Sequence, residues 1–261
     1  MQNKYFKAGL FGAVLLTSTS AMAAVPSYST GFDDASSLTE WRGGRAVVVQ
    51  WDDPACTSYN SQYDYDFANP GTDQVAALVT SDATGSSVLN TFSDYNNAAF
   101  QPNGCVTVNI FREYTIAAGD EGDYEFKFVN AFPNDPANTA VSAQAFIKIL
   151  DPNNGYNDVL SGALVQSVTG SEGEKTISVT IDSSAAGLIL QYGFSNASAN
   201  YQETGMYYDD VCFDSAGACP SALGGGGSTS TADPNAIPAL PLWALFGLAG
   251  VVGLMGLRRK A

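Results

Sequence analysis

Residues 206–214 read MYYDDVCFD, a stretch in which two tyrosines and two adjacent aspartates interrupt an otherwise apolar run. Successive side chains of a strand alternate between its two faces, so Asp209 and Asp210 point in opposite directions and cannot both serve one site through their side chains. Asp209 shares its parity with apolar and aromatic residues and is therefore expected to face the core, where it needs a hydrogen-bonding partner or a cation. This core-facing set comprises Tyr207, Asp209, Val211 and Phe213.

The same two-residue period recurs in the middle of the chain and predicts strands rather than helices. Between these segments lie runs rich in Gly, Asn, Asp and Ser, such as DPNNGYND and DSSAAG, which are typical of tight turns. Short strands separated by turns favour an antiparallel all-β sandwich. The alternating segments are 122–132 (GDYEFKFVNAF), 143–150 (AQAFIKIL), 176–181 (TISVTI) and 187–195 (GLILQYGFS).

The composition excludes several classes of function. The 261 residues include no histidine, which rules out Ser-His-Asp and Cys-His catalysis and histidine-based zinc sites. Residues 24–236 hold six bases against 26 acids, a formal charge of −20, because the other five of the 11 bases lie at the two ends. Nucleic acid and anionic lipid surfaces are poor partners for so acidic a body, whereas cations are good ones.

The first 23 residues have the pattern of a secretory signal peptide. Lys4 and Lys7 precede the apolar run 8–16, and Ala21-Met22-Ala23 supplies a cleavage site of the A-x-A type. We therefore expect the protein to be exported and its mature chain to begin at Ala24.

The last 25 residues, 237–261, have the pattern of a membrane anchor. Residues 237–257 carry no charge over 21 positions, and a helix of that length rises roughly 31 Å, enough to cross the hydrocarbon core of a bilayer. The Arg-Arg-Lys that follows is expected to stay on the cytoplasmic side, which leaves the body across the membrane. The Gly-, Ser- and Thr-rich stretch 221–236 is expected to be a flexible linker between the body and this anchor.

This tail resembles the C-terminal sorting signals that bacterial exosortases recognise, in the variant that begins Ile-Pro-x-Leu. The resemblance rests on a motif, a hydrophobic helix and a basic end in that order, although the Val-Pro-Glu-Pro form of the motif is absent. It implies that an exosortase-type processing enzyme removes the helix during transfer to the cell surface. The alternative is a plain single-span anchor. The residues concerned are Ile237, Pro238, Leu240, Pro241 and Trp243, with Arg258 and Arg259 at the basic end.

The four cysteines predict two disulfides, because the chain is expected to leave the cytoplasm and no C-x-x-C pair is present. Three connectivities are possible. Cys212 and Cys219 bracket the six-residue turn FDSAGA and are the natural pair, which leaves Cys56 with Cys105. Closing the longer loop stabilises the fold by roughly 4 kcal/mol on a chain-entropy model.

The two ends of the body resemble those of jelly-roll carbohydrate-binding modules and galactose-binding-like domains. Those domains begin with a Phe-Glu or Phe-Asp segment that leads to a tryptophan, and they end on an Ile-Asp-Asp-Val strand beside it. This chain has GFDDASSLTEWR (31–42) and YYDDVCFD (207–214), with AFIKILDP in the middle. The resemblance implies a jelly-roll β-sandwich over residues 24–220. The matching residues are Phe32, Asp33, Asp34, Trp41, Tyr208, Asp209, Asp210 and Val211.

In that family a calcium ion often ties the first strand to the last. Carried over by position, Asp33 or Asp34 with Asp209 or Asp210 would supply carboxylate oxygens, and backbone carbonyls would complete a shell of six to eight. The alternative is that these aspartates only accept hydrogen bonds from backbone amides at the strand ends.

A candidate sugar site lies in SYNSQYDYDF, residues 58–67, where Tyr59, Tyr63 and Tyr65 stand close to Asp64. Flat aromatic rings stack on sugar rings, and a carboxylate accepts hydrogen bonds from sugar hydroxyls. The alternative, which the odd-numbered parity favours, is a strand whose residues 63, 65 and 67 enter the core.

The sequence therefore predicts an exported, non-catalytic module that binds carbohydrate or a matrix polymer at the cell surface. The 26 acids permit the pair of carboxylates that glycoside hydrolysis needs, but no spacing singles out such a pair. The alternative is a structural or adhesive surface protein without a defined glycan site. Exposed tyrosine rings along a groove would favour sugar binding, whereas buried rings would favour the structural role.

Overall fold

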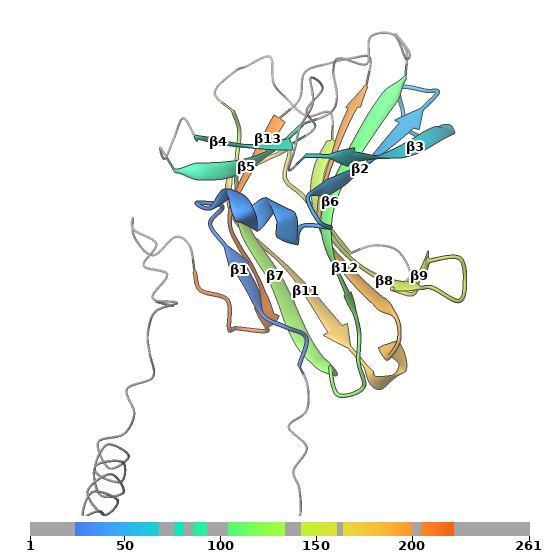
Figure 1. Cartoon of the computed structure of the whole chain (residues 1–261), viewed down its shortest axis with the longest axis vertical. Coiled ribbons are helices and arrows are strands. Elements are labelled where there is room, and N and C mark those ends of the chain that lie inside the picture. The colour runs from blue at the N-terminus through green and yellow to red at the C-terminus, as the bar shows by residue number, and fades with distance from the viewer. Residues whose placement is uncertain are drawn as a thin grey trace, which may run out of the picture. The chain divides into compact units, whose positions relative to one another are not determined.

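The computed structural model describes residues 24–67, 76–80, 86–92, 104–133, 142–160, 164–199 and 205–221. Over these residues the chain forms two antiparallel β-sheets with two short 3-10 helices, η1 (Ala35–Glu40) and η3 (Ser183–Ala185) (Figure 1). The predicted all-β sandwich is thus confirmed, and it is consistent with a jelly roll. None of the described helices has the length and apolar character that a membrane crossing needs. The predicted signal peptide, nearly all of the linker and the C-terminal tail lie outside the described residues.

One sheet contains six of the described strands in the order β11-β7-β13-β5-β4, with β1 also paired to β13. The first strand of the body therefore lies beside the last, with Tyr28 opposite Phe213 and Thr30 opposite Val211. The strands of this sheet are β1 (Tyr28–Thr30), β4 (Ala76–Thr80), β5 (Ser87–Phe92), β7 (Gly122–Ala131), β11 (Gly173–Ile181) and β13 (Gly205–Ser215).

The other sheet contains seven described strands in the order β10-β8-β12-β6-β2-β3, with β9 paired to β8. Its inner face packs against the six-stranded sheet, and its outer face carries the groove described below. The strands are β2 (Arg45–Trp51), β3 (Tyr59–Asp66), β6 (Cys105–Thr115), β8 (Ser142–Asp151), β9 (Asn157–Asp158), β10 (Leu164–Ser167) and β12 (Ile189–Ala199).

The core between the sheets comes from the inward parity of the long strands, because alternation places every second side chain on the buried face. Phe126 and Phe128 of β7 contact Phe194 of β12, with ring centroids 5.5 and 5.2 Å apart, and so join the two sheets. Trp41, which follows η1, is fully buried, and its Nε1 donates a hydrogen bond to the Tyr28 hydroxyl 2.9 Å away. The tryptophan that suggested the family likeness is therefore part of the core.

The last strand contains an irregularity that the sequence pattern does not reveal. The register of β13 against β7 shifts between Asp209 and Cys212, and Asp210 has a positive φ of 47°. A β-bulge adds one residue to one strand, so it exchanges the faces of the residues on its two sides. Asp210 lies within this bulge, and Asp209 is the paired residue directly before it.

The bulge makes the predicted parity wrong for the first half of the strand. Met206 and Tyr208, whose parity is opposite to that of the predicted core-facing set, are fully buried, whereas Tyr207 and Asp209, which belong to that set, are only partly buried. Beyond the bulge Val211 and Phe213 do lie in the core, as predicted. A strict two-residue period cannot place both halves, because it assumes an unbroken strand.

Candidate functional site

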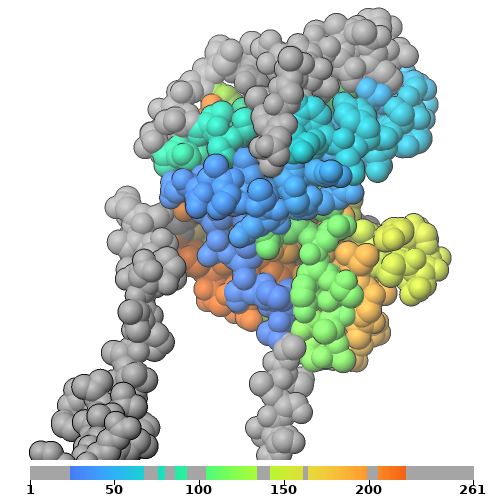
Figure 2. Space-filling model, viewed as in Figure 1, coloured from blue at the N-terminus to red at the C-terminus, as the bar shows by residue number. Residues whose placement is uncertain are grey.

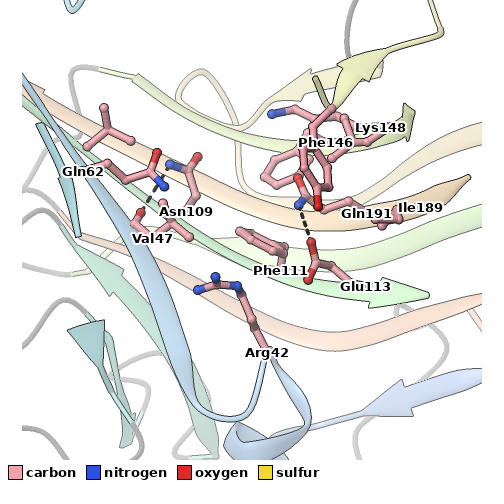
Figure 3. Close-up of a pocket in the computed structure, with 13 residues that line it drawn as sticks. Arg42, Val47, Gln62, Asn109, Phe111, Glu113, Phe146, Lys148, Ile189 and Gln191 are labelled. Carbon is pink, nitrogen blue, oxygen red and sulfur yellow. Dashed lines mark hydrogen bonds between the residues drawn. The ribbon is translucent and has the colours of Figure 1, made fainter. Parts of the chain in front are cut away.

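A groove of about 670 Å³ lies on the outer face of the seven-stranded sheet (Figure 3). Its volume falls within the range of roughly 300–1,000 Å³ that is typical of small-molecule sites. Side chains of five strands contribute to it, together with one residue that follows η1 and one from the turn after β8. We call it the outer groove, and its lining residues are Arg42, Val47, Val49, Gln62, Asn109, Phe111, Glu113, Phe146, Lys148, Leu150, Tyr156, Ile189 and Gln191.

The floor of the outer groove contains an aromatic row that crosses three strands. Gly193 of β12 lies opposite Phe111 of β6 on one side and Phe146 of β8 on the other. The two rings are 6.4 Å apart between centroids and inclined by 59°. They belong to a small apolar cluster with Val47 and Val49 that is separate from the main core. Gly193 permits this arrangement, because an added Cβ would lie 2.1 Å from the backbone oxygen of Ile110.

A polar row runs parallel to the aromatic row, two residues further along the strands. Gln191 of β12 lies opposite Glu113 of β6 and opposite Lys148 of β8. The Gln191 amide Nε2 donates a hydrogen bond to Glu113 Oε1, 3.1 Å away, as Figure 3 shows. This row places an acid, an amide and a base side by side on the groove wall.

Two cations cover the aromatic floor. The Arg42 guanidinium lies 5.5 Å from the Phe111 ring centroid, and the Lys148 ammonium lies 4.7 Å from the Phe146 centroid. The phenylalanines are consequently only 6% and 2% exposed. Arg42 Nη1 also forms an ion pair with Asp64 Oδ1 at 2.7 Å. Cation–π contacts of this kind contribute about 0.5–1 kcal/mol each at exposed sites, and more when the cation is desolvated.

Lys148 differs from Arg42 in its electrostatic surroundings. Burial lowers the pKa of the Lys148 ammonium, and the carboxylate of Asp158 only partly opposes this effect. Within the described part of the chain no hydrogen bond or ion pair holds the Lys148 ammonium. Among the described residues, the Lys148 ammonium is thus the one charged group of the lining without a hydrogen bond or an ion pair.

Amides and an exposed tyrosine complete the lining. Asn109 Nδ2 donates a long hydrogen bond of 3.4 Å to the Val47 carbonyl oxygen, and Gln62 on β3 lies further along the same side. Tyr156 is 60% exposed and has a positive φ of 59° in the tight turn after β8. Figure 2 shows this part of the chain, in yellow, standing out from the body. The groove therefore combines hydrogen-bonding side chains with one accessible aromatic ring.

The sugar site predicted in β3 is not assembled as one surface. Tyr63 and Tyr65 are partly buried and pack against the main core, in agreement with the alternative that the odd-numbered residues point inward. Asp64 points outward and binds Arg42 at the edge of the outer groove. Tyr59 is 61% exposed and makes an edge contact with Trp51, at a centroid distance of 6.2 Å, so it lies apart from the other tyrosines.

The four aspartates proposed for calcium are brought together in part. Asp34 is not one of the gathered carboxylates: its Oδ1 accepts a hydrogen bond from the Ser36 amide at 2.8 Å, and it is the N-cap of η1. Oxygens of Asp33, Asp209 and Asp210 lie 3.5, 3.7 and 3.9 Å from the position that a Cβ on Gly31 would occupy. Three carboxylates thus gather around one small space beside Gly31.

Crowding and burial perturb this carboxylate cluster. Burial, with smaller contributions from Asp210 and Asp33, raises the pKa of Asp209 to about 6. Burial also raises the pKa of Asp210, with Asp33 and Glu174 adding to the effect. Hard carboxylate oxygens suit calcium, but in the described residues no three His, Cys, Asp or Glu side chains are arranged to hold a metal ion. The donors are therefore of the right kind, and they would have to rotate to form a ligand set.

Two disulfides join the pairs expected from the sequence. Cys56, in the turn after β2, is bonded to Cys105 at the start of β6, with their Cα atoms 5.3 Å apart. Cys212 of β13 is bonded to Cys219, with their Cα atoms 5.8 Å apart. The first bond ties the β2–β3 connection, near one end of the outer groove, to β6.

Sequence reasoning missed the residues that form the outer groove. Phe146 and Lys148 lie in AFIKIL, where neither set of alternate residues is mostly polar. This pattern indicates that both faces of the strand are covered, and it was the one signal in the sequence for the groove. Nothing local to Phe111 or Gly193 predicts that the register aligns them with Phe146. The groove is a product of strand pairing between residues more than 30 positions apart.

Comparisons with known proteins do not assign the chain to a family. No protein-family model and no curated protein matches it. Solved structures with a loose likeness include the carbohydrate-binding module TmCBM61 in complex with β-1,4-galactotriose, at 14% identity over 54% of this chain and 82% of that chain, with a TM-score of 0.34. Another is the CBM22-1 xylan-binding domain of Paenibacillus barcinonensis Xyn10C, at 9% identity over 72% and 92% of the two chains, with a TM-score of 0.38.

Enzymes are found among these structures as well. The enzymatically active domain of the bacteriophage CBA120 tailspike protein 4 has 13% identity over 71% of this chain and 20% of that chain, with a TM-score of 0.36. Because these TM-scores are all below 0.5, the likeness decides neither function nor ligand. The function proposed next rests on the groove itself.

Proposed function

We propose that this protein is an exported, surface-displayed, non-catalytic module that binds carbohydrate in the outer groove. The observation that carries the proposal is the groove itself, in which amide and charged side chains surround an aromatic floor on an open sheet face. Sugars present both hydroxyl groups and weakly polar ring faces, so they need hydrogen-bonding partners beside apolar contact surface. Gln62, Asn109 and Gln191 supply the former, and Tyr156 supplies an accessible ring.

The lining residues favour binding over catalysis. Glycoside hydrolysis requires two carboxyl groups about 5–9.5 Å apart across the scissile bond. Of the 13 described lining residues, Glu113 alone carries a carboxylate, and it accepts a hydrogen bond from Gln191. A single acid of this kind serves naturally as an acceptor for a sugar hydroxyl.

A binding screen with matched tyrosine variants tests this proposal. The full-length protein in detergent would be assayed by calorimetry against a panel of polysaccharides. Tyr156→Ala is expected to weaken the affinity about tenfold, whereas Tyr59→Ala, which removes an equally exposed ring outside the groove, is expected to change it less than twofold. Equal losses would place the site elsewhere, and no binding to any glycan would overturn the proposal.

Export and surface display are proposed on the two terminal patterns, 1–23 and 237–261. We expect an exosortase-type enzyme to remove the tail beyond the Ile-Pro-x-Leu-Pro motif, so the mature surface form lacks Arg258 and Arg259. The intact mass of the surface protein measures this directly. A surface form that starts at Ala24 but retains the basic end would leave the plain anchor as the correct model.

Calcium is proposed as a structural ion of the carboxylate cluster formed by Asp33, Asp209 and Asp210. The support is their convergence beside Gly31, where a divalent cation would relieve the mutual repulsion of the carboxylates. In that case the ion would strengthen the pairing of the chain's beginning with β13, away from the outer groove. Its role would be stability rather than ligand binding.

The packing of Tyr63 and Tyr65 against the core favours a second candidate, a structural or adhesive surface protein without a glycan site. On this alternative the outer groove is an open sheet face with no specific ligand. It predicts no saturable binding to any polysaccharide, together with unchanged surface adhesion of cells that carry Tyr156→Ala.

A further inference from the structure

Positive charge is scarce on this body, and one third of it lines the outer groove. Residues 24–236 hold six bases, and two of them, Arg42 and Lys148, are lining residues. With Glu113 as the acid, the described lining carries a formal charge of +1, whereas residues 24–236 carry −20. Asp64, paired with Arg42, and Asp158, near Lys148, stand beside this lining, so the groove region is much less negative than the rest of the body.

The protein itself satisfies two of these three charged groups. Arg42 Nη1 lies 2.7 Å from Asp64 Oδ1, and Glu113 Oε1 accepts the Gln191 amide at 3.1 Å. Neither group requires a ligand to be paired. The remaining group is the Lys148 ammonium.

In the described residues no acid lies within ion-pair distance of the Lys148 ammonium. Gln191 lies between Lys148 and Glu113, so the acid is two strands away, at a backbone separation of roughly 9.5 Å. The nearer acid is Asp158, whose Oδ1 accepts the amides of Ile149 and Leu160 at 3.2 and 3.1 Å. Its buried Oδ2 has no hydrogen-bonding partner among the described residues, and its charge stabilises the ammonium from a distance without forming an ion pair. Within the described part of the chain, the ammonium contacts the Phe146 ring, whose centroid lies 4.7 Å away.

A half-buried ammonium without a hydrogen-bonding acceptor is unfavourable, and a bound anion removes this cost. A carboxylate gives the strongest such bond, because donor and acceptor are both ionised. We propose that the outer groove binds an acidic glycan, with a uronate carboxylate accepting hydrogen bonds from the Lys148 ammonium. This inference rests on the proposed function, since it names the ligand class of the same groove.

The charge of the body makes the role of Lys148 selective. A polyanion is repelled by an acidic surface, so an acidic glycan gains from the protein only where a cation meets its carboxylate. A neutral glycan experiences neither effect. Removal of the ammonium should therefore weaken the binding of acidic glycans and leave that of neutral glycans nearly unchanged.

Matched polymers test the proposal without any variant. Pectate, alginate and hyaluronan would each be compared with its carboxyl-reduced form, in which every uronate is a neutral hexose on the same backbone. The full-length protein is expected to bind at least one acidic form ten times or more tightly than its reduced form. If every polymer that binds does so equally well in the reduced form, or if only neutral glycans bind, the acidic ligand is wrong and the groove function stands. If no glycan binds at all, both fail.

Two lysine variants then locate the effect. Lys148→Gln is expected to abolish the preference for the acidic form, whereas Lys175→Gln, on β11 of the other sheet, is expected to change it less than twofold. Dextran sulfate measures simple ion exchange. If the affinity for dextran sulfate equals that for the uronate polymer, and if both lysine variants lose affinity equally, binding is due to diffuse electrostatic attraction. This outcome would overturn the role of Lys148. Thermal unfolding of each variant verifies that it is folded.

Discussion

Phe194 of β12 and Tyr208 of β13 stack with their ring centroids 3.7 Å apart and their planes inclined by only 17°. Each ring belongs to a different sheet, and both are fully buried, so this pair fastens the two layers at the centre of the sandwich. Tyr208→Ala should lower the free energy of unfolding by about 3–5 kcal/mol, because it removes the stack and leaves a cavity. Chemical denaturation measures the change.

Tyr208→Phe is the matched control for this prediction. It keeps the ring and removes a buried hydroxyl, and we expect the free energy of unfolding to stay within about 1 kcal/mol of the parent value. A loss of 3 kcal/mol in Tyr208→Phe would mean that the hydroxyl, and not the stack, joins the layers.

Gly193 is expected to tolerate no side chain. An added Cβ would meet the Ile110 backbone oxygen at 2.1 Å and the Phe111 Cα at 2.6 Å, and neither can move without separating β6 from β12. Gly193→Ala should therefore lower the free energy of unfolding by about 2 kcal/mol or more and widen the floor of the outer groove. Gly170→Ala, where nothing lies within 4 Å of the added Cβ, should change it by less than about 1 kcal/mol. Equal effects at the two positions would contradict this packing.

The fold was largely predictable because its signals are local. Alternation in GDYEFKFVNAF and GLILQYGFS follows from the pleat of a strand and needs no knowledge of its neighbours. Tyr208 was placed on the wrong face because a bulge depends on how the partner strand pairs, and β7 lies some 80 residues earlier in the chain. The outer groove was missed for the same reason, since Phe111, Gly193 and Phe146 become neighbours only through the register.

The carboxylate cluster predicts that stability rises as the pH falls. The folded-state pKa of Asp209 is raised to about 6 from its ordinary value of 3.8, mainly by burial, so the folded form binds a proton more tightly than the unfolded chain. Between about pH 7 and pH 4 protonation therefore favours the folded state. Because the side chain is partly exposed, solvent screening reduces the gain to the order of 1 kcal/mol.

This pH effect would be measured in chelator by denaturation at pH 7 and pH 5. Asp209→Asn, which is neutral at every pH, should flatten most of the difference. If the free energy of unfolding of the parent protein is lower at pH 5 than at pH 7 under these conditions, the carboxylates are not crowded in the way that the structure implies.

Calcium should reverse the sign of this pH dependence. A divalent ion beside Asp33, Asp209 and Asp210 would hold the carboxylates ionised. Protons would then compete with the ion, and stability would fall as the pH falls.

Calcium at about 100 times its dissociation constant should add roughly 2.7 kcal/mol to the free energy of unfolding, or about 5–10 °C to the melting temperature, relative to chelator. Asp209→Asn should abolish that difference. Asp34→Ala should lower the stability slightly and equally in both conditions and keep the difference, because Asp34 caps η1 and its carboxylate is not among those gathered beside Gly31. If the melting curves of the parent protein are the same with and without calcium, the carboxylate cluster does not bind the metal.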